Sequence, residues 1–211
     1  MTKKDPATTI SAADRLLEVT TDPLHRQILE NYRRHAILEV TGEWEGIFDE
    51  DSAVEHPVYR FNITGYEGVV ADGADAVKGI YQMLRKTSTC VILVEDEKLN
   101  VCDWGFASES FFNTYQRGTD LIKLGLAAEK PDGYYILRQR FAMIWPYDER
   151  GRMAGEHVYE DKSFREIIEI AVEDYVTPDD ARARLLPLLR PLPKFSPPPK
   201  ASKVSKVSVH A

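Results

Sequence analysis

The residues best suited to proton transfer in this 211-residue chain begin at His56, in the segment Val-Glu-His-Pro-Val-Tyr at positions 54–59. An imidazole titrates near neutral pH and can either donate or accept a proton. Tyr59, in the same segment, carries a phenol that can donate a hydrogen bond to a leaving oxygen. We predict that both residues are catalytic in an elimination or isomerisation. The alternative is a structural histidine at the start of a strand, followed by an ordinary strand tyrosine.

Two further candidates share one face of an expected helix. This helix begins at Asp22, whose carboxylate can cap free amides, and ends at Gly42. Tyr32 and His35 recur at helical spacing on its apolar stripe. We predict that Tyr32 is catalytic and that His35 contacts the substrate. Both could instead fill the core with their polar tips satisfied.

A fourth catalytic candidate, Glu109, lies in a strand expected from Phe106 to Arg117. Alternation along a strand places Glu109 on the same face as Phe111, Asn113 and Tyr115. On a concave, apolar face, the pKa of this carboxyl group would be raised, as a general acid requires. On the outer face, Glu109 would simply be solvated.

The later strands supply charged and aromatic residues. Arg138 and Arg140 share one face of an expected strand and Phe141 lies on the other, while Glu156 belongs to the last strand. We expect one arginine to pair with Glu109 or Glu156 in a structural role. Aromatic residues in the cavity would favour a flat, aromatic substrate. The predicted substrate-binding residues are His35, Trp104, Phe111, Asn113, Tyr115, Arg140, Phe141 and Glu156.

Helices precede strands along the chain, which predicts an α+β domain. A third helix is expected after an Asp72 cap, and another helix after Thr177-Pro178. Residues 163–172 also read as helical, and residues 118–133 form either a pocket lid or a dimer contact. The strands are expected at 54–61, 90–95, 100–104, 106–117, 134–147 and 152–161. The expected division is an N-terminal extension (1–21), the main domain (22–161), C-terminal helices (162–192) and a Pro/Lys-rich tail (193–211).

Composition limits the classes of partner. The formal net charge of −7 argues against a nucleic-acid-binding surface, which needs clustered cations. The start of the chain lacks an apolar signal region, and no apolar run is long enough to span a membrane. Cys90 and Cys102 show no metal-ligand spacing. We therefore expect a cytoplasmic protein that binds a small molecule without a metal or cofactor.

The order of these elements and the motif Val-Glu-His-Pro-Val-Tyr resemble the nuclear transport factor 2-like (NTF2-like) superfamily. That superfamily includes ketosteroid isomerases, scytalone dehydratase, limonene epoxide hydrolase and SnoaL-like polyketide cyclases. The resemblance covers about residues 22–161. It implies a cone in which a curved antiparallel sheet wraps around the N-terminal helices, with a pocket at the open end. It also implies a homodimer formed through the convex face of the sheet.

The resemblance also implies roles for individual residues. It implies a catalytic base at His56, as in several of these enzymes. The tyrosine that binds substrate oxygen in ketosteroid isomerases corresponds to His35, which is a departure from the pattern; Tyr32 could serve instead. The aspartate used by the epoxide hydrolases corresponds to Val158, which argues against that mechanism.

The function implied is a cofactor-independent acid–base lyase acting on a hydrophobic aromatic molecule. A narrower resemblance is to γ-formaldehyde lyases that convert lignin-derived diarylpropane diols into stilbenes. The alternatives are a SnoaL-like cyclase or scytalone-type dehydratase or isomerase, and, in another class, a non-catalytic binding or assembly module. A cone filled with side chains would favour the module, whereas a cavity holding titratable groups would favour an enzyme.

Overall fold

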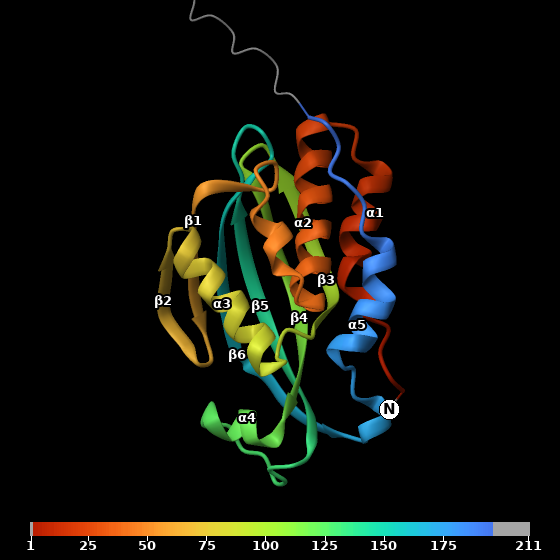
Figure 1. Cartoon of the computed structure of the whole chain (residues 1–211), viewed down its shortest axis with the longest axis vertical. Helices are drawn as coiled ribbons and strands as arrows, with labels where there is room; N and C mark the ends of the chain where they lie inside the picture. The colour runs from red at the N-terminus through yellow and green to blue at the C-terminus, as the bar shows by residue number, and fades with distance from the viewer. Residues whose placement is uncertain (1, 196–211) are drawn as a thin grey trace, which may run out of the picture.

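The computed structural model describes residues 2–195 and shows one curved sheet with helices over its concave face (Figure 1). The sheet has six strands in the order β2-β1-β6-β5-β4-β3. All neighbouring strands are antiparallel except β1 and β6, which run parallel. The predicted α+β fold, a curved sheet wrapped around N-terminal helices, is confirmed, with the refinement that the sheet is mixed rather than purely antiparallel. The strands are β1 (Ala53–Ile63), β2 (Tyr66–Asp72), β3 (Ile92–Cys102), β4 (Gly105–Arg117), β5 (Tyr134–Pro146) and β6 (Met153–Ile170).

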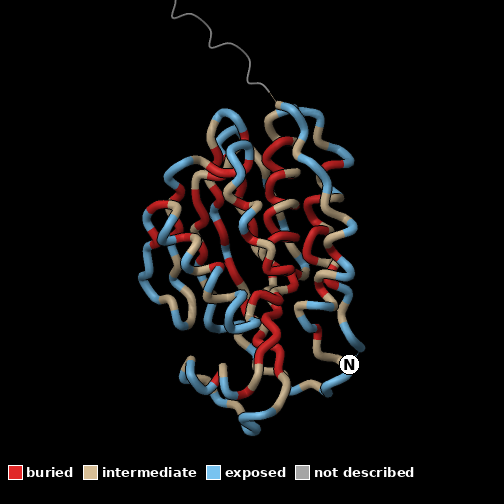
Figure 2. The backbone as a smooth tube through the Cα atoms, viewed as in Figure 1, coloured by how far each residue is buried: buried red, intermediate tan, exposed pale blue. Residues whose placement is uncertain are grey.

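Helix α2 (Pro23–Thr41) is the central element packed in the concave face. The Asp22 carboxylate accepts hydrogen bonds from the backbone N–H groups of Leu24 and His25, and Pro23 occupies the first turn. Gly42 ends the helix in the left-handed conformation, with φ of 73°. Both predicted ends of this helix are confirmed. Most of its residues are buried (Figure 2).

Two shorter elements complete the inner layer. The 3-10 helix η2 (Trp44–Phe48) follows α2, and α3 (Ala74–Thr87) lies over β1 and β2 (Figure 1). The predicted cap at Asp72 is wrong, because Gly73 occupies the N-cap position of α3. Asp72 is instead the last residue of β2, where its carboxylate contacts His56.

Both ends of the described chain pack beside α2. The N-terminal residues form η1 (Pro6–Ile10) and α1 (Ser11–Val19), and Ala13 of α1 is fully buried. Residues 163–172 were expected to be helical, which is wrong: β6 continues to Ile170, because its backbone pairs with that of β5 as far as Tyr134. After η3 (Val172–Asp174), Thr177 caps α5 (Pro178–Leu185) as predicted, and η4 (Leu186–Leu188) follows.

The connection between β4 and β5 contains a short helix, α4 (Gly118–Lys123), at one end of the sheet (Figure 1). The structure has the single strand β3, from Ile92 to Cys102, where two strands were expected at 90–95 and 100–104. A bulge interrupts its pairing between Glu95 and Lys98. No helix among residues 2–195 is both long and apolar enough to cross a membrane. The predicted tail falls mostly in 196–211, outside the described residues.

The parallel contact of β1 with β6 requires a glycine. A Cβ atom on Gly155 would lie 2.2 Å from the carbonyl oxygen of Val58. We predict that Gly155→Ala lowers the free energy of unfolding by about 1–3 kcal/mol, as overpacking does. Urea unfolding measures this change.

The matched control is Gly79→Ala in α3, where an added Cβ would meet nothing within 4 Å. Alanine should raise stability there by about 0.5–1 kcal/mol, because glycine is unfavourable inside a helix. Equal effects of the two substitutions would contradict the close strand contact.

Candidate active site

A cavity of about 320 Å³ lies between the concave face of the sheet and helices α2 and α3. Most of its wall is apolar. Phe61 and Ile63 of β1, Phe112 of β4 and Phe141 of β5 line its middle. Helix α4 reaches its outer end through Asp120, Lys123 and Leu124. The volume is within the range of small-molecule sites.

A chain of hydrogen bonds joins three rings at the inner end of this cavity. The hydroxyl of Tyr59 lies 3.0 Å from that of Tyr81, which lies 2.9 Å from Nε2 of His35. All three side chains are buried. Oε2 of Glu39 lies 3.6 Å from the same His35 nitrogen. Burial raises the pKa of Tyr59 and of Tyr81 well above the usual range, so both phenols keep their protons at neutral pH.

Glu156 supplies a carboxyl group beside this chain. Its register partner across the parallel pair is Tyr59, and both side chains line the cavity. Glu156 is only 8% exposed. Burial first, and then repulsion from Glu39, raise the pKa of Glu156 well above its usual range. A carboxyl group in this state keeps its proton to a higher pH than an exposed carboxyl group does, which suits a role in proton transfer.

Tyr32 contributes its ring to the cavity wall but directs its hydroxyl elsewhere. The hydroxyl donates to Oε1 of Glu97 at 2.7 Å, and the other oxygen of that carboxylate is buried. The ring packs against Phe106 and Trp145 at centroid distances of 4.6 and 5.5 Å. Burial raises the pKa of Glu97 as well. Tyr32 thus forms part of the inner wall, with its polar tip satisfied by β3.

The structure brings five of the predicted site residues together at the cavity. They are Tyr32, His35, Tyr59, Phe141 and Glu156. Phe141 lines the cavity and Arg140 lies on the opposite face of β5, as the alternation indicated, so the substrate contact predicted at Arg140 is not at the cavity. The pairing of an arginine with Glu109 also occurs, with Arg140 as the partner.

The structure does not bring His56 to the cavity. Its imidazole is exposed and lies 2.7 Å from Oδ1 of Asp72 at the outer edge of the sheet. Tyr59 follows His56 by three positions, and side chains at an odd offset along a strand point to opposite faces. Pro57 does not reverse this alternation, because the inward residues are Pro57, Tyr59 and Phe61.

Glu109 lies on the outer face of the sheet. Its carboxylate accepts a hydrogen bond from Arg140 at 2.5 Å, and this contact lowers the pKa of Glu109. Of the two alternatives for Glu109, the structure therefore shows the outer face, where its pKa is lowered rather than raised. Phe111 shares this face and packs under Arg138, with 4.0 Å between guanidinium carbon and ring centroid.

Three other predicted substrate contacts lie away from the cavity. Asn113 is fully buried and donates to the backbone oxygen of Leu93. Tyr115 packs edge-on against Tyr175 on the side of the sheet covered by the C-terminal segment. Trp104 is half-exposed in the turn between β3 and β4. The alternation correctly groups Asn113 and Tyr115 with Glu109 on one face of β4, but this face is not the one that lines the cavity.

Sequence reasoning missed several lining residues. Tyr81 of α3, Glu39 of α2 and Trp145 of β5 line the cavity, but none of them is among the predicted site residues. Glu39 follows His35 by one helical turn, so spacing alone places both side chains on the same face of the helix. The Trp145 ring lies 4.7 Å from that of His35.

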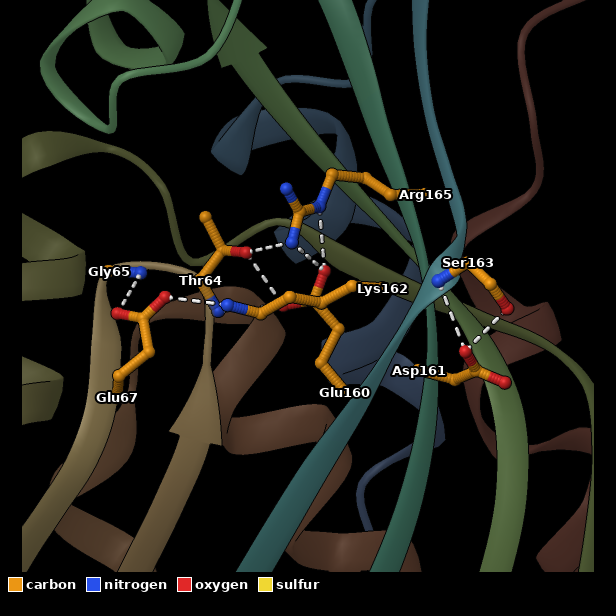
Figure 3. Close-up of polar contacts among 8 residues, drawn as sticks. All are labelled: Thr64, Gly65, Glu67, Glu160, Asp161, Lys162, Ser163 and Arg165. Atoms are coloured by element: carbon orange, nitrogen blue, oxygen red, sulfur yellow. Dashed lines mark hydrogen bonds and ion pairs between the residues drawn. The ribbon is translucent and has the colours of Figure 1, made fainter.

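A polar network closes the rim where β1 turns into β2 (Figure 3). The backbone N–H and hydroxyl of Thr64 both donate to Oε2 of Glu160 at 2.7 Å, and Arg165 binds Oε1 of the same carboxylate. The side chain of Glu160 is fully buried, and Thr64 lines the cavity. Strand β6 bulges between Asp161 and Glu166, which pair with Arg140 and Arg138 of β5. This bulge lets Arg165 turn back toward Glu160.

No protein-family model matches the chain, and no curated protein matches its sequence. An NTF2-like protein from Anabaena variabilis matches with a TM-score of 0.49 and 12% identity, covering 68% of this chain and 96% of that one.

Two further solved structures have the same level of likeness. A SnoaL-like polyketide cyclase, so described, from Jannaschia has a TM-score of 0.48 and 11% identity over 67% of this chain and 90% of that one. A phenazine biosynthesis-related protein from Pseudomonas aeruginosa has a TM-score of 0.42 and 12% identity over 82% and 94%. None of these likenesses carries information about substrate or reaction.

The raised pKa of Glu156 has a consequence for stability. A carboxyl group whose folded-state pKa exceeds its unfolded value stabilises the fold fully below the unfolded pKa, and this stability is lost as pH rises through the folded pKa. We predict that Glu156→Gln retains more of its free energy of unfolding at alkaline pH than the unsubstituted protein does. Urea unfolding across a pH series measures the difference.

Glu18→Gln is the matched control, because Glu18 is exposed on α1. It should leave the pH profile unchanged. A Glu156→Gln profile parallel to that of the unsubstituted protein would show that the Glu156 carboxyl group is not perturbed by burial.

Proposed function

We propose that this protein is a cofactor-independent acid–base catalyst, a lyase or isomerase, that acts on a hydrophobic and largely aromatic small molecule. The observation that carries the proposal is a buried Glu156 carboxyl group beside the Tyr59–Tyr81–His35 chain in an apolar cavity. Elimination and isomerisation both require one group that accepts a proton and another that stabilises or protonates an oxygen.

In the proposal, the Glu156 carboxyl group performs the proton transfer and the Tyr59–Tyr81–His35 chain stabilises the oxygen. Glu156 moves the proton, since burial raises its pKa and lets this carboxyl group hold a proton to higher pH than an exposed one would. When Nε2 of His35 is the donor, Tyr81 passes its hydrogen to Tyr59 and the Tyr59 hydroxyl is directed outward along the chain. In this setting the Tyr59 hydroxyl donates to Sδ of Met153 at 3.2 Å, and in the proposal a substrate oxygen takes the place of this weak acceptor. The chain therefore presents a hydrogen-bond donor beside the carboxyl group.

A narrower form of the proposal is the elimination of water and formaldehyde from a diarylpropane diol. The terminal hydroxyl gives up its proton and its carbon leaves as formaldehyde. The electrons of the broken carbon–carbon bond form the stilbene double bond, and the benzylic hydroxyl leaves as water after protonation. No oxidant or reductant is needed. Two proton-transfer groups in an apolar cavity support this reaction, and they support a cyclase or dehydratase reaction equally.

The alternative of a non-catalytic binding module is less well supported. It predicts a cone filled with side chains, whereas the cone holds a cavity that includes Glu156 and His35. Homodimer formation through the convex face also stays a proposal. The exposed apolar side chains of Ile144, Tyr159 and Phe164 on that face support it.

We predict that Glu156→Gln lowers kcat by about 10²–10⁴-fold, the range expected for loss of an acid–base group. The assay follows formaldehyde release and stilbene absorbance from a diarylpropane diol. Tyr81→Phe should also lower kcat, since it breaks the hydrogen-bond chain at its centre.

His56→Ala is the matched control, because His56 lies outside the cavity. It should keep nearly full activity. Loss of turnover in His56→Ala with retention in Glu156→Gln would transfer the chemistry to the outer edge of the sheet and overturn this proposal. No turnover by the unsubstituted protein would remove the formaldehyde reaction and leave the dehydratase and cyclase reactions to be assayed.

A further inference from the structure

A second carboxyl group lines the cavity at its inner end, and the catalytic proposal does not use it. Glu39 belongs to the last turn of α2, and its side chain lines the cavity. Its Oε2 lies 3.6 Å from Nε2 of His35, and the side chain is 22% exposed. Glu156 lines the same cavity from β6. The inner end therefore has one carboxyl group on its helix wall and another on its sheet wall.

No lysine or arginine of the cavity wall neutralises these two carboxyl groups. Among the lining residues in the described part of the chain, Lys123 at the outer end is the only lysine or arginine, and it has an ion-pair partner on α4. Two arginines near the end of α2 are paired outside the cavity: Arg85 with Glu45 at 3.1 Å and Arg182 with Glu43 at 3.4 Å. Two like charges in an apolar cavity repel each other, because little water screens them. A proton on one of the two carboxyl groups relieves this repulsion.

The other titratable groups around Glu156 do not relieve the repulsion. Besides His35, they are buried tyrosines of α2, β1, α3 and the segment after β5: Tyr32, Tyr59, Tyr81 and Tyr147. Burial raises the pKa of each of these phenols well above its usual range, so they are neutral at neutral pH. After burial, repulsion from Glu39 is the cause that raises the pKa of Glu156. The proton on Glu156 and the charge on Glu39 thus depend on each other.

We propose that Glu39 and Glu156 hold one proton between them and act as a catalytic pair. Glu39 takes the proton that the substrate gives up, and Glu156 gives its proton to the leaving oxygen. A molecule bound between the helix wall and the sheet wall contacts both carboxyl groups. This inference rests on the proposed function and adds a second catalytic residue to the same site.

In the diol reaction, protons and electrons balance within the pair. The terminal O–H bond breaks and its proton passes to the Glu39 carboxylate. The carbon–carbon bond breaks to release formaldehyde, and its electrons form the stilbene double bond. The benzylic carbon–oxygen bond breaks, and the hydroxyl leaves as water with the proton of Glu156. Transfer of one proton from Glu39 to Glu156 then restores the starting state.

A carbon-13 NMR titration of the glutamate side-chain carboxyl groups tests the pair without a substrate. The signal of Glu156 is identified by its loss in Glu156→Gln. Glu39→Gln should move the titration of Glu156 to lower pH by about one pH unit, because the repulsion from Glu39 is removed. An unchanged Glu156 titration in Glu39→Gln would overturn the pair and leave Glu39 only as a neighbour of His35.

Glu30→Gln is the matched control for this titration. Glu30 lies on the same helix but is not a lining residue, and its carboxylate pairs with Arg190 at 2.8 Å. The substitution changes the net charge by the same amount as Glu39→Gln does. It should leave the Glu156 titration in place, which would show that the shift in Glu39→Gln comes from the neighbouring carboxyl group.

Turnover of the diarylpropane diol tests the two catalytic roles. Glu39→Gln should lower kcat by about 10²–10⁴-fold, the range for loss of an acid–base group. The double variant with Glu156→Gln should lower kcat little further, because residues that act as a unit have non-additive effects. Glu39→Asp, which keeps a carboxyl group, should retain more turnover than Glu39→Gln. Full turnover in Glu39→Gln would overturn the inference.

The two readouts separate this inference from the catalytic proposal. If Glu156→Gln lost turnover while Glu39→Gln kept it, the proposed function would stand and the pair would fail. If the unsubstituted protein did not turn over the diol while the Glu156 titration moved in Glu39→Gln, the diol reaction would fail and the shared proton would stand.

Discussion

The parallel pairing of β1 with β6 is the contact on which the site depends. It places Glu156 directly beside Tyr59, although the two residues are far apart in the sequence. The absence of a side chain at Gly155 allows this pairing, since the Val58 carbonyl occupies the space of a Cβ atom. With the strands in this register, both polar side chains face the concave side. Any outward shift of β6 would separate the carboxyl group from the tyrosines.

This arrangement places polar groups where the core would otherwise be apolar. The Tyr59, Tyr81 and His35 side chains satisfy one another, so their burial is tolerated. No hydrogen bond to the Glu156 carboxyl group occurs within residues 2–195, and burial raises its pKa. A buried carboxyl group without hydrogen-bond partners is unfavourable for stability when charged. Proton transfer to a bound molecule gives that unfavourable group a physical role.

The rim follows from the same strand. The bulge in β6 turns Arg165 back to Glu160, and this carboxylate holds the end of β1 through Thr64. The rim is therefore stabilised by charge-assisted hydrogen bonds that are saturated within the protein. The cavity consequently has titratable side chains at its inner end and a network of paired polar groups at its rim.

The sequence by itself determined the elements whose signals are local. Asp22, Pro23 and Gly42 mark the ends of α2, and strand alternation correctly separated Phe141 from Arg140. Alternation says which residues share a face, but only tertiary packing decides which face becomes concave. That choice placed Glu109 outside and Glu156 inside. The pairing of β1 with β6 likewise joins distant segments, so Tyr59 and Glu156 could not be matched before the sheet was assembled.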